Sequence, residues 1–319
     1  MERSGAPPTG EAEGVPPVTA VAACAAMAAF YVAVLYSPTV VLRLPPPLSL
    51  ESFLFRRFAC AAVSSAVSVF LCSLLLPIRN IHGAMPFFGI YSVRADHMWQ
   101  ALVIPLLLTS LLYSSSLVSR IWSLYSSRKE VGSYSISAEN MKIITQKFVC
   151  WIRLLSCNVF AWRTYIVAPL TEEIVFRACM IPLLLCGGFK TYKIIFFSPV
   201  FFSLAHLHHF WELHLQRYSF RRASLTVGLQ LGYTVIFGWY ASFLLIRTGH
   251  LISPIVAHML CNVMGLPLLS SPQLKGTVSI AFVIGVTCFF WFLFPATSPD
   301  IYNERADNCK CWHGYCSWK

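Results

Sequence analysis

The sequence predicts an all-α, polytopic membrane protein, a bundle of about eight transmembrane helices. Three observations lead to this class. Of the 319 residues, 57% are hydrophobic and only 12% are charged, which is too apolar for a chain with a fully solvated surface. The apolar residues form runs of about 20, the length that a helix needs to cross about 30 Å of hydrocarbon. Ionisable residues interrupt several runs in the C-terminal half. Such residues are energetically costly inside a membrane and usually have a functional role there.

The expected spans are residues 18–44, 58–76, 101–122, 148–167, 169–185, 194–209, 225–246, 251–269 and 278–294. The first span follows a polar, Pro- and Gly-rich segment and is too long for a cleaved signal, so a signal-anchor helix is expected after a disordered tail, residues 1–17. Arg153, Arg163 and Pro169 interrupt the fourth and fifth spans, and one of these is expected to be interfacial or broken. Residues 18–296 are predicted to form one transmembrane domain, followed by a C-terminal tail, residues 297–319.

The net charge of +11 comes from short basic clusters beside the apolar spans, such as Arg56-Arg57 and Arg221-Arg222. This distribution is typical of loops that set membrane orientation, so membrane lipid rather than nucleic acid is the expected partner. The tail carries Cys309, Cys311, His313 and Cys316. Their spacing matches no strong zinc template, and the last residues, Trp318 and Lys319, suit a prenylation site poorly.

The segment PLTEEIVFR, residues 169–177, places three charges inside an apolar run. Pro169 suits the first turn of a helix, and acidic residues near a helix N-terminus are favoured by its dipole. Glu173 and Arg177 are spaced i, i+4 and are predicted to pair as a structural unit. Glu172 points about 100° away on the helix and has no such cation, so its carboxylate is free to act on something else.

Two later spans carry further polar residues. His206 follows Phe202 by one helical turn, and His258 precedes Asn262 by one turn. Taken singly, a histidine on an apolar helix is often a core residue, and an asparagine there often joins neighbouring helices. Polar groups on three successive spans are more economically explained by one shared, hydrated intramembrane cavity.

These residue types suit water attack on a carbonyl group. Glu172 and His206 are predicted to deprotonate and orient a water, while N-H groups of His258 and Asn262 hold the oxyanion, which indicates peptide or ester hydrolysis. Other chemistries stay open. Glutamate and histidine also bind zinc, although HExxH is absent; Cys179 could be a nucleophile; and a transporter also places ionisable groups mid-membrane.

The ordered set EExxxR (Glu172, Glu173, Arg177), FxxxH (Phe202, His206) and HxxxN (His258, Asn262) resembles the type II CAAX prenyl endopeptidases of the glutamic intramembrane protease superfamily, in particular their eukaryotic branch. The match forms a motif core at about residues 167–267. It implies a multi-pass enzyme of the endoplasmic reticulum membrane that removes the C-terminal tripeptide from prenylated CAAX proteins, without cofactor or metal.

The same resemblance implies roles and partners. Glu172 and His206 are expected on the catalytic water, His258 and Asn262 at the oxyanion, and Glu173, Arg177 and Phe202 in support. Farnesylated or geranylgeranylated proteins such as small GTPases are the expected substrates, and their prenyl chains, which favour lipid by about 0.8 kcal/mol per buried CH2, bring the scissile bond to the membrane. The alternatives are a non-catalytic prenyl-protein-binding or scaffold member of the same fold, or a zinc-dependent intramembrane protease.

Overall fold

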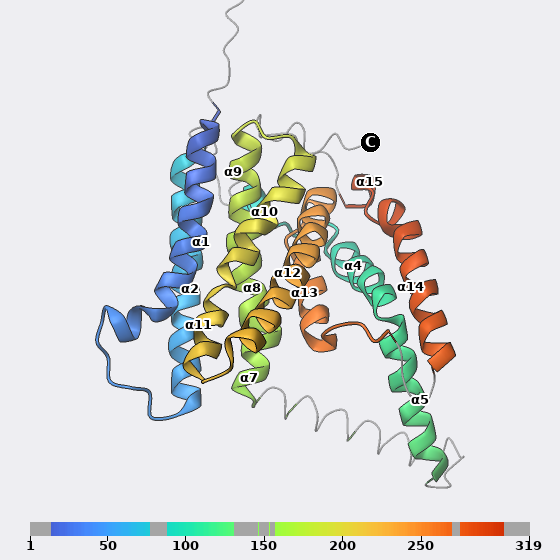
Figure 1. Ribbon diagram of the computed structural model, residues 1–319. Helices are drawn as coiled ribbons and strands as arrows, with labels where there is room; N and C mark the ends of the chain where they lie inside the picture. The colour runs from blue at the N-terminus through green and yellow to red at the C-terminus, as the bar shows by residue number, and fades with distance from the viewer. Residues whose placement is uncertain are drawn as a thin grey trace, which may run out of the picture.

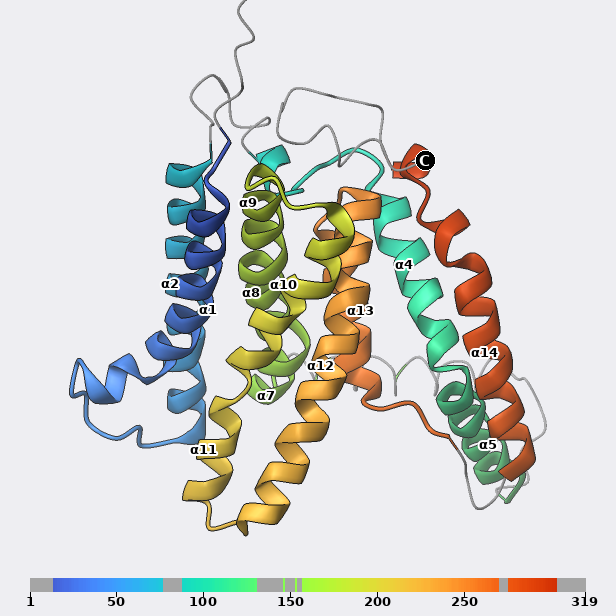
Figure 2. The ribbon, with the colours of Figure 1, turned by 45° about the horizontal axis from the view of Figure 1, so that its top comes forward.

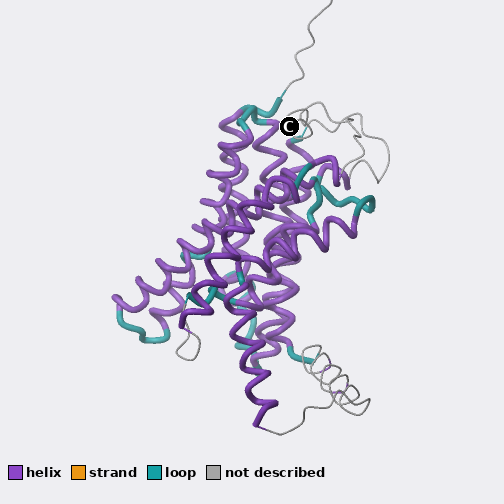
Figure 3. Tube along the Cα trace, turned by 90° about the vertical axis from the view of Figure 1, so that its right-hand side faces the viewer, coloured by secondary structure: helices purple, strands orange, loops and turns teal. Residues whose placement is uncertain are grey.

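The computed structural model describes residues 14–76, 88–130, 157–269 and 275–302, together with residues 146 and 153. Across these ranges the only regular elements are helices (Figures 1 and 3). The predicted all-α fold is therefore confirmed. The cysteine-containing segment near the C-terminus, with its possible zinc and prenylation motifs, lies outside the described residues.

The N-terminal part contains a helical hairpin and a bent helix pair. The hairpin is formed by α1 (Pro17–Val40) and α2 (Leu50–Leu75). Helix α2 begins after Ser49, whose hydroxyl accepts a hydrogen bond from the backbone N-H of Ser52, a usual N-cap arrangement. The next pair, α4 (Met98–Leu112) and α5 (Ser114–Glu130), meets at an angle of 79°.

The central helix is a continuous run from Val159 to Cys186. It comprises α7 (Val159–Trp162), the π-helical η1 (Arg163–Val167), α8 (Ala168–Glu173), the π-helical η2 (Ile174–Cys179) and α9 (Met180–Cys186). Each π segment contains a residue that lies four positions before a proline. In η1 this residue is Tyr165, four before Pro169, and in η2 it is Ala178, four before Pro182. Proline has no N-H to donate to the carbonyl of that residue, and in an α-helix the proline ring would collide with the same carbonyl. The wider turn of the π segment relieves this clash.

The C-terminal helices complete the bundle. They are α10 (Thr191–Ala205), α11 (His208–Leu215), α12 (Phe220–Thr248), α13 (Ile252–Met264), α14 (Lys275–Ala296) and the short α15 (Pro299–Tyr302). Gly249 ends α12 with a φ of 67°, the left-handed conformation that glycine adopts without a side-chain clash.

The central run lies between two groups of helices. Helices α1 and α2 pack against it on one side, and α12 and α13 lie on the other, with α4 and α14 beyond them (Figures 1 and 2). Helices α10 and α12 pack closely against each other. As a result, three helices with polar motifs, the central run, α10 and α13, meet near the middle of the bundle.

Five helical spans in the described residues are long and apolar enough to cross a membrane, and six if α4 and α5 form one bent span. The central run falls outside this count because it carries four charged residues, and the 13-residue α13 falls outside it because it is short. The expected helix start at Pro169 is wrong. Val167 and Ala168 both have right-handed helical backbone angles, and the part of the expected 148–167 span from Val159 onward continues directly into the next.

Candidate active site

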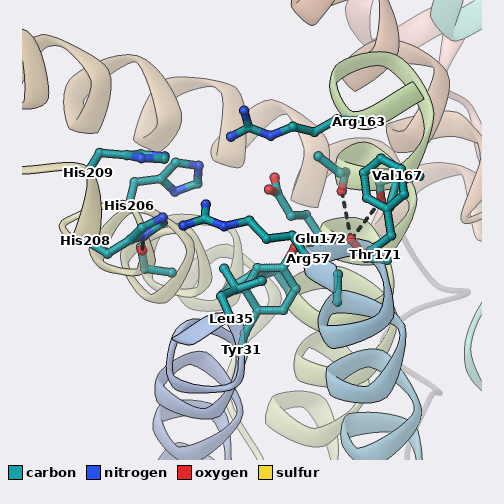
Figure 4. Close-up of a pocket in the computed structure, with 15 residues that line it drawn as sticks. Tyr31, Leu35, Arg57, Arg163, Val167, Thr171, Glu172, His206, His208 and His209 are labelled. Atoms are coloured by element: carbon teal, nitrogen blue, oxygen red, sulfur yellow. Dashed lines mark hydrogen bonds between the residues drawn. The ribbon is translucent and has the colours of Figure 1, made fainter. Parts of the chain in front are cut away.

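A cavity of about 90 Å³ opens beside the central run, several times the roughly 10–15 Å³ that one water molecule needs. Glu172 and His206 both line it, from α8 and from the residue that follows α10. Figure 4 shows their side chains facing this space from different helices. The structure therefore brings together the two residues that the sequence assigned to the water.

Glu172 lies at the cavity wall with its side chain 15% exposed. Its Oε2 is 3.8 Å from Nε2 of His258, and within the described chain no closer ion pair engages this carboxylate. As predicted from the helical spacing, the carboxylate without a cation at i+4 is the one that faces the cavity.

Glu173 is fully buried and has two partners. Its Oε1 accepts hydrogen bonds from Arg177, at 3.2 Å, and from Nδ1 of His258, at 2.7 Å. The first contact confirms the predicted i, i+4 pair. The second was not predicted, and it means that Glu173 also orients a residue of the candidate catalytic set instead of serving the fold alone.

Arg177 is held between this carboxylate and two aromatic rings. Its guanidinium carbon lies 4.3 Å from the centre of the Phe202 ring and 5.7 Å from that of Phe237, and the side chain is buried. Such cation-π contacts are stronger where water is excluded. Phe202 thus stabilises the buried charge, which explains why an aromatic residue stands one turn before His206.

The orientation of His206 follows from one backbone contact. Its Nδ1 lies 2.8 Å from the carbonyl oxygen of Phe202. Because that oxygen can only accept, Nδ1 carries the proton of the neutral ring and Nε2 keeps its lone pair. His206 is therefore arranged to accept a proton or a hydrogen bond at Nε2.

His258 and Asn262 lie on α13 and do not line the cavity. His258 reaches its edge through the contact with Glu172. Asn262, one turn further along, donates from Nδ2 to the carbonyl oxygen of Thr164 in η1, at 2.8 Å. This bond ties α13 to the central run, so the interhelical role considered for Asn262 is present in the structure.

Several cavity residues were not predicted. Arg163 in η1 and Arg57 in α2 both line the space and are labelled in Figure 4. Arg163 had a signal, since it interrupts an apolar run. The sequence analysis interpreted Arg57 only as part of a basic cluster in a loop. Nothing in the sequence alone indicated that α2 packs beside this site.

A polar cluster borders the cavity where α11 begins. His208, His209 and Glu212 place possible metal-ligand atoms within 4.8 Å of one another. In this structure Glu212 accepts hydrogen bonds from Arg57 at 2.5 Å, from Tyr36 at 3.2 Å and from Nδ1 of His209 at 3.1 Å. The carboxylate therefore neutralises Arg57, and the cluster is an ion-pair network.

The proposed rival nucleophile, Cys179, is fully buried in η2 and does not line the cavity. Its backbone carbonyl accepts a hydrogen bond from the Cys72 thiol at 3.4 Å. A thiol packed in the protein interior lacks the access that a nucleophile needs.

Comparison with known proteins gives consistent matches. The family model for the type II CAAX prenyl endopeptidase, Rce1-like, matches residues 154–264. CAAX prenyl protease 2 of Arabidopsis thaliana is 50% identical over 309 residues, 97% of this chain and 99% of that protein. CAAX prenyl protease 2 of Homo sapiens is 33% identical over 290 residues, 88% of this chain and 82% of that protein. No solved structure matches the chain.

Proposed function

The chain belongs to the type II CAAX prenyl endopeptidases, and from this membership we propose how its cavity carries out the reaction. The protein is a multi-pass membrane hydrolase that removes the C-terminal tripeptide from prenylated CAAX proteins. The observation that carries the proposed mechanism is the convergence of Glu172 and His206, from separate helices, on one cavity large enough for water.

In this mechanism the water lies between Glu172 and His206. Glu172 accepts one proton as the water oxygen attacks the carbonyl carbon of the prenylated cysteine, and Nε2 of His206 accepts a hydrogen bond that orients the water. When the tetrahedral intermediate collapses, the C-N bond breaks and the proton passes to the leaving amine nitrogen. The products are a prenylcysteine carboxylate and a free tripeptide.

His258 and Asn262 stabilise the oxyanion. With Nδ1 donating to Glu173, Nε2 of His258 faces Glu172 at 3.8 Å, and it can donate to the oxyanion when the ring carries a second proton. The side-chain amide of Asn262 donates one N-H to the Thr164 carbonyl oxygen and its second N-H to the oxyanion. Glu173 and Arg177 act as positioning residues, and Phe202 supports Arg177.

Substrate range, location and domain limits are further parts of the proposal. We expect farnesylated and geranylgeranylated small GTPases among the substrates, because their lipid chains and C-terminal motifs match the reaction. We place the enzyme in the endoplasmic reticulum membrane, in contact with lipid. Residues 18–296 form the protease domain, between an N-terminal tail and a C-terminal tail.

The direct test is a purified-protein assay on a farnesylated CAAX peptide, with products identified by mass spectrometry. We expect release of the intact C-terminal tripeptide by the wild-type protein and none by Glu172→Gln. A release of single residues, or equal turnover by the two proteins, contradicts the mechanism. Binding of the peptide without turnover by wild-type protein supports a scaffold instead.

A further inference from the structure

Arg163 is the one cation lining the cavity that has no hydrogen bond or ion pair in the described part of the chain. Its side chain is partly buried, and Figure 4 shows the guanidinium extended over the cavity on the side of Glu172. A guanidinium that faces a cavity without a hydrogen-bond partner has its donors free for a ligand. Arg163 is therefore placed to bind an anionic group that enters the cavity.

The other cavity arginine already has a carboxylate partner. Arg57 donates to Glu212 at 2.5 Å, and its guanidinium lies over the Phe53 ring at 4.9 Å. These two contacts fix its position and neutralise its charge. Of the two arginines, Arg163 is the one available to a ligand.

The π segment η1 brings Arg163 toward the cavity. Arg163 and Glu172 are nine residues apart, about two and a half turns of an ideal α-helix, which would place them on opposite faces. The hydrogen bonds of a π-helix run from i to i+5 and widen the turn, so five π-helical residues change the rotation between the two side chains. Both then line the same cavity.

The distance along the helix matches the length of the leaving fragment. Nine residues rise about 13 Å at 1.5 Å each, and three extended residues span about 10 Å. When the scissile bond lies at Glu172 and the tripeptide extends along the central run, the C-terminus of the tripeptide is within reach of the Arg163 side chain. The chemical group at that end is the terminal carboxylate.

Resting on the proposed function, we propose that Arg163 binds the C-terminal carboxylate of the substrate and so selects chains that end three residues after the prenylated cysteine. The guanidinium suits this role because its donors match a carboxylate in a bidentate arrangement. An internal peptide segment brings no anion to this position and leaves Arg163 unpaired, so it is disfavoured.

The test compares two forms of one farnesylated CAAX peptide, one ending in a free carboxylate and one in a neutral amide. For each protein the ratio of kcat/KM, acid over amide, is measured, which makes the result independent of the folded fraction. Wild-type protein should prefer the acid by about 10- to 100-fold, the usual effect of one charge-assisted contact. Arg163→Gln should bring this ratio near 1, because it lowers kcat/KM for the acid more than kcat/KM for the amide.

Three further variants sharpen the assignment. Arg163→Lys keeps the positive charge but loses the bidentate geometry of the guanidinium, so it should give an intermediate ratio. The same variant provides the measurement if Arg163→Gln does not fold. The control Arg221→Gln removes a charge from an exposed position at the start of α12 and should keep the wild-type ratio. Arg57→Gln should also keep the preference, since its partner is Glu212.

A wild-type preference retained by Arg163→Gln overturns the inference, as does equal cleavage of acid and amide by the wild-type protein. Loss of preference in Arg57→Gln alone assigns the carboxylate to Arg57 instead. These results differ from failure of the proposed function, in which wild-type protein releases no tripeptide from either peptide.

Discussion

Nδ1 of His258 lies 2.7 Å from Oε1 of Glu173, although 85 residues separate the two in the chain. This contact joins α13 to the central run at the edge of the cavity. It fixes the His258 ring so that Nε2 faces Glu172, at 3.8 Å from Oε2. Two neighbouring glutamates therefore act on one histidine from opposite ring nitrogens, Glu173 holding it and Glu172 facing it across the cavity edge.

The two glutamates should respond differently to the same isosteric change. Glu172→Gln should lower turnover by at least about 100- to 10,000-fold, the contribution of a general base, with little change in Tm, since Glu172 makes no close ion pair. Glu173→Gln should lower both Tm and turnover, because it breaks a buried pair with Arg177, a change that costs about 3–5 kcal/mol, and releases His258. Thermal unfolding and turnover of both purified variants provide the measurement. Equal effects on Tm would contradict this division.

Turnover should not depend on a metal ion. Glu173 and His258 bind each other, and Glu212 is held by Arg57, so these three possible zinc ligands already have partners. We expect chelation and dialysis to leave activity unchanged, and elemental analysis to find no stoichiometric zinc. Activity that is lost on stripping and restored by one equivalent of metal would support a metalloprotease.

The contacts of this site within one helix could be predicted from sequence, whereas the contacts between helices could not. Helical spacing was enough to predict the Glu173-Arg177 pair and to identify Glu172 as the free carboxylate. The contact between Glu173 and His258 depends on how α13 packs, which spacing along one helix does not report. Arg163 was missed for a different reason, because ideal α-helical geometry turns it away from Glu172 and only the π segment changes that rotation.

Gly238 should be intolerant of even one added methyl group. A Cβ at this position would lie 2.5 Å from Cβ of Pro199 and 3.3 Å from a terminal nitrogen of Arg177. Gly238→Ala should therefore push α12 away from α10, destabilise the protein by about 1–3 kcal/mol and lower turnover. Gly232→Ala on the same helix is the matched control, since nothing lies within 4 Å of its added Cβ, and it should be neutral or stabilising by up to about 1 kcal/mol. Similar Tm values for the two variants would contradict the close approach of α10 and α12.

Asn262 provides the sharpest test of the proposed oxyanion site, because its amide already bonds to the Thr164 carbonyl at 2.8 Å. If its second N-H reaches the oxyanion, Asn262→Ala should lower kcat by about 100- to 1,000-fold, as for other donors of this kind. KM should change little, since the contact strengthens only in the transition state. If Asn262 only joins α13 to η1, the loss should be near 0.6 kcal/mol, the average for interhelical hydrogen bonds in membranes, and it should appear in Tm.

Asn262→Asp separates these outcomes further. The variant nearly preserves side-chain size, but an ionised carboxylate would repel both the Thr164 carbonyl oxygen and a developing negative charge in the cavity. We expect it to be folded and severely impaired in kcat, with partial recovery at low pH as the carboxyl group becomes protonated and regains a donor. The same pH series on wild-type protein corrects for titration of the other site groups. Turnover near the wild-type value at neutral pH would remove Asn262 from the oxyanion site and leave it as the link between α13 and the central run.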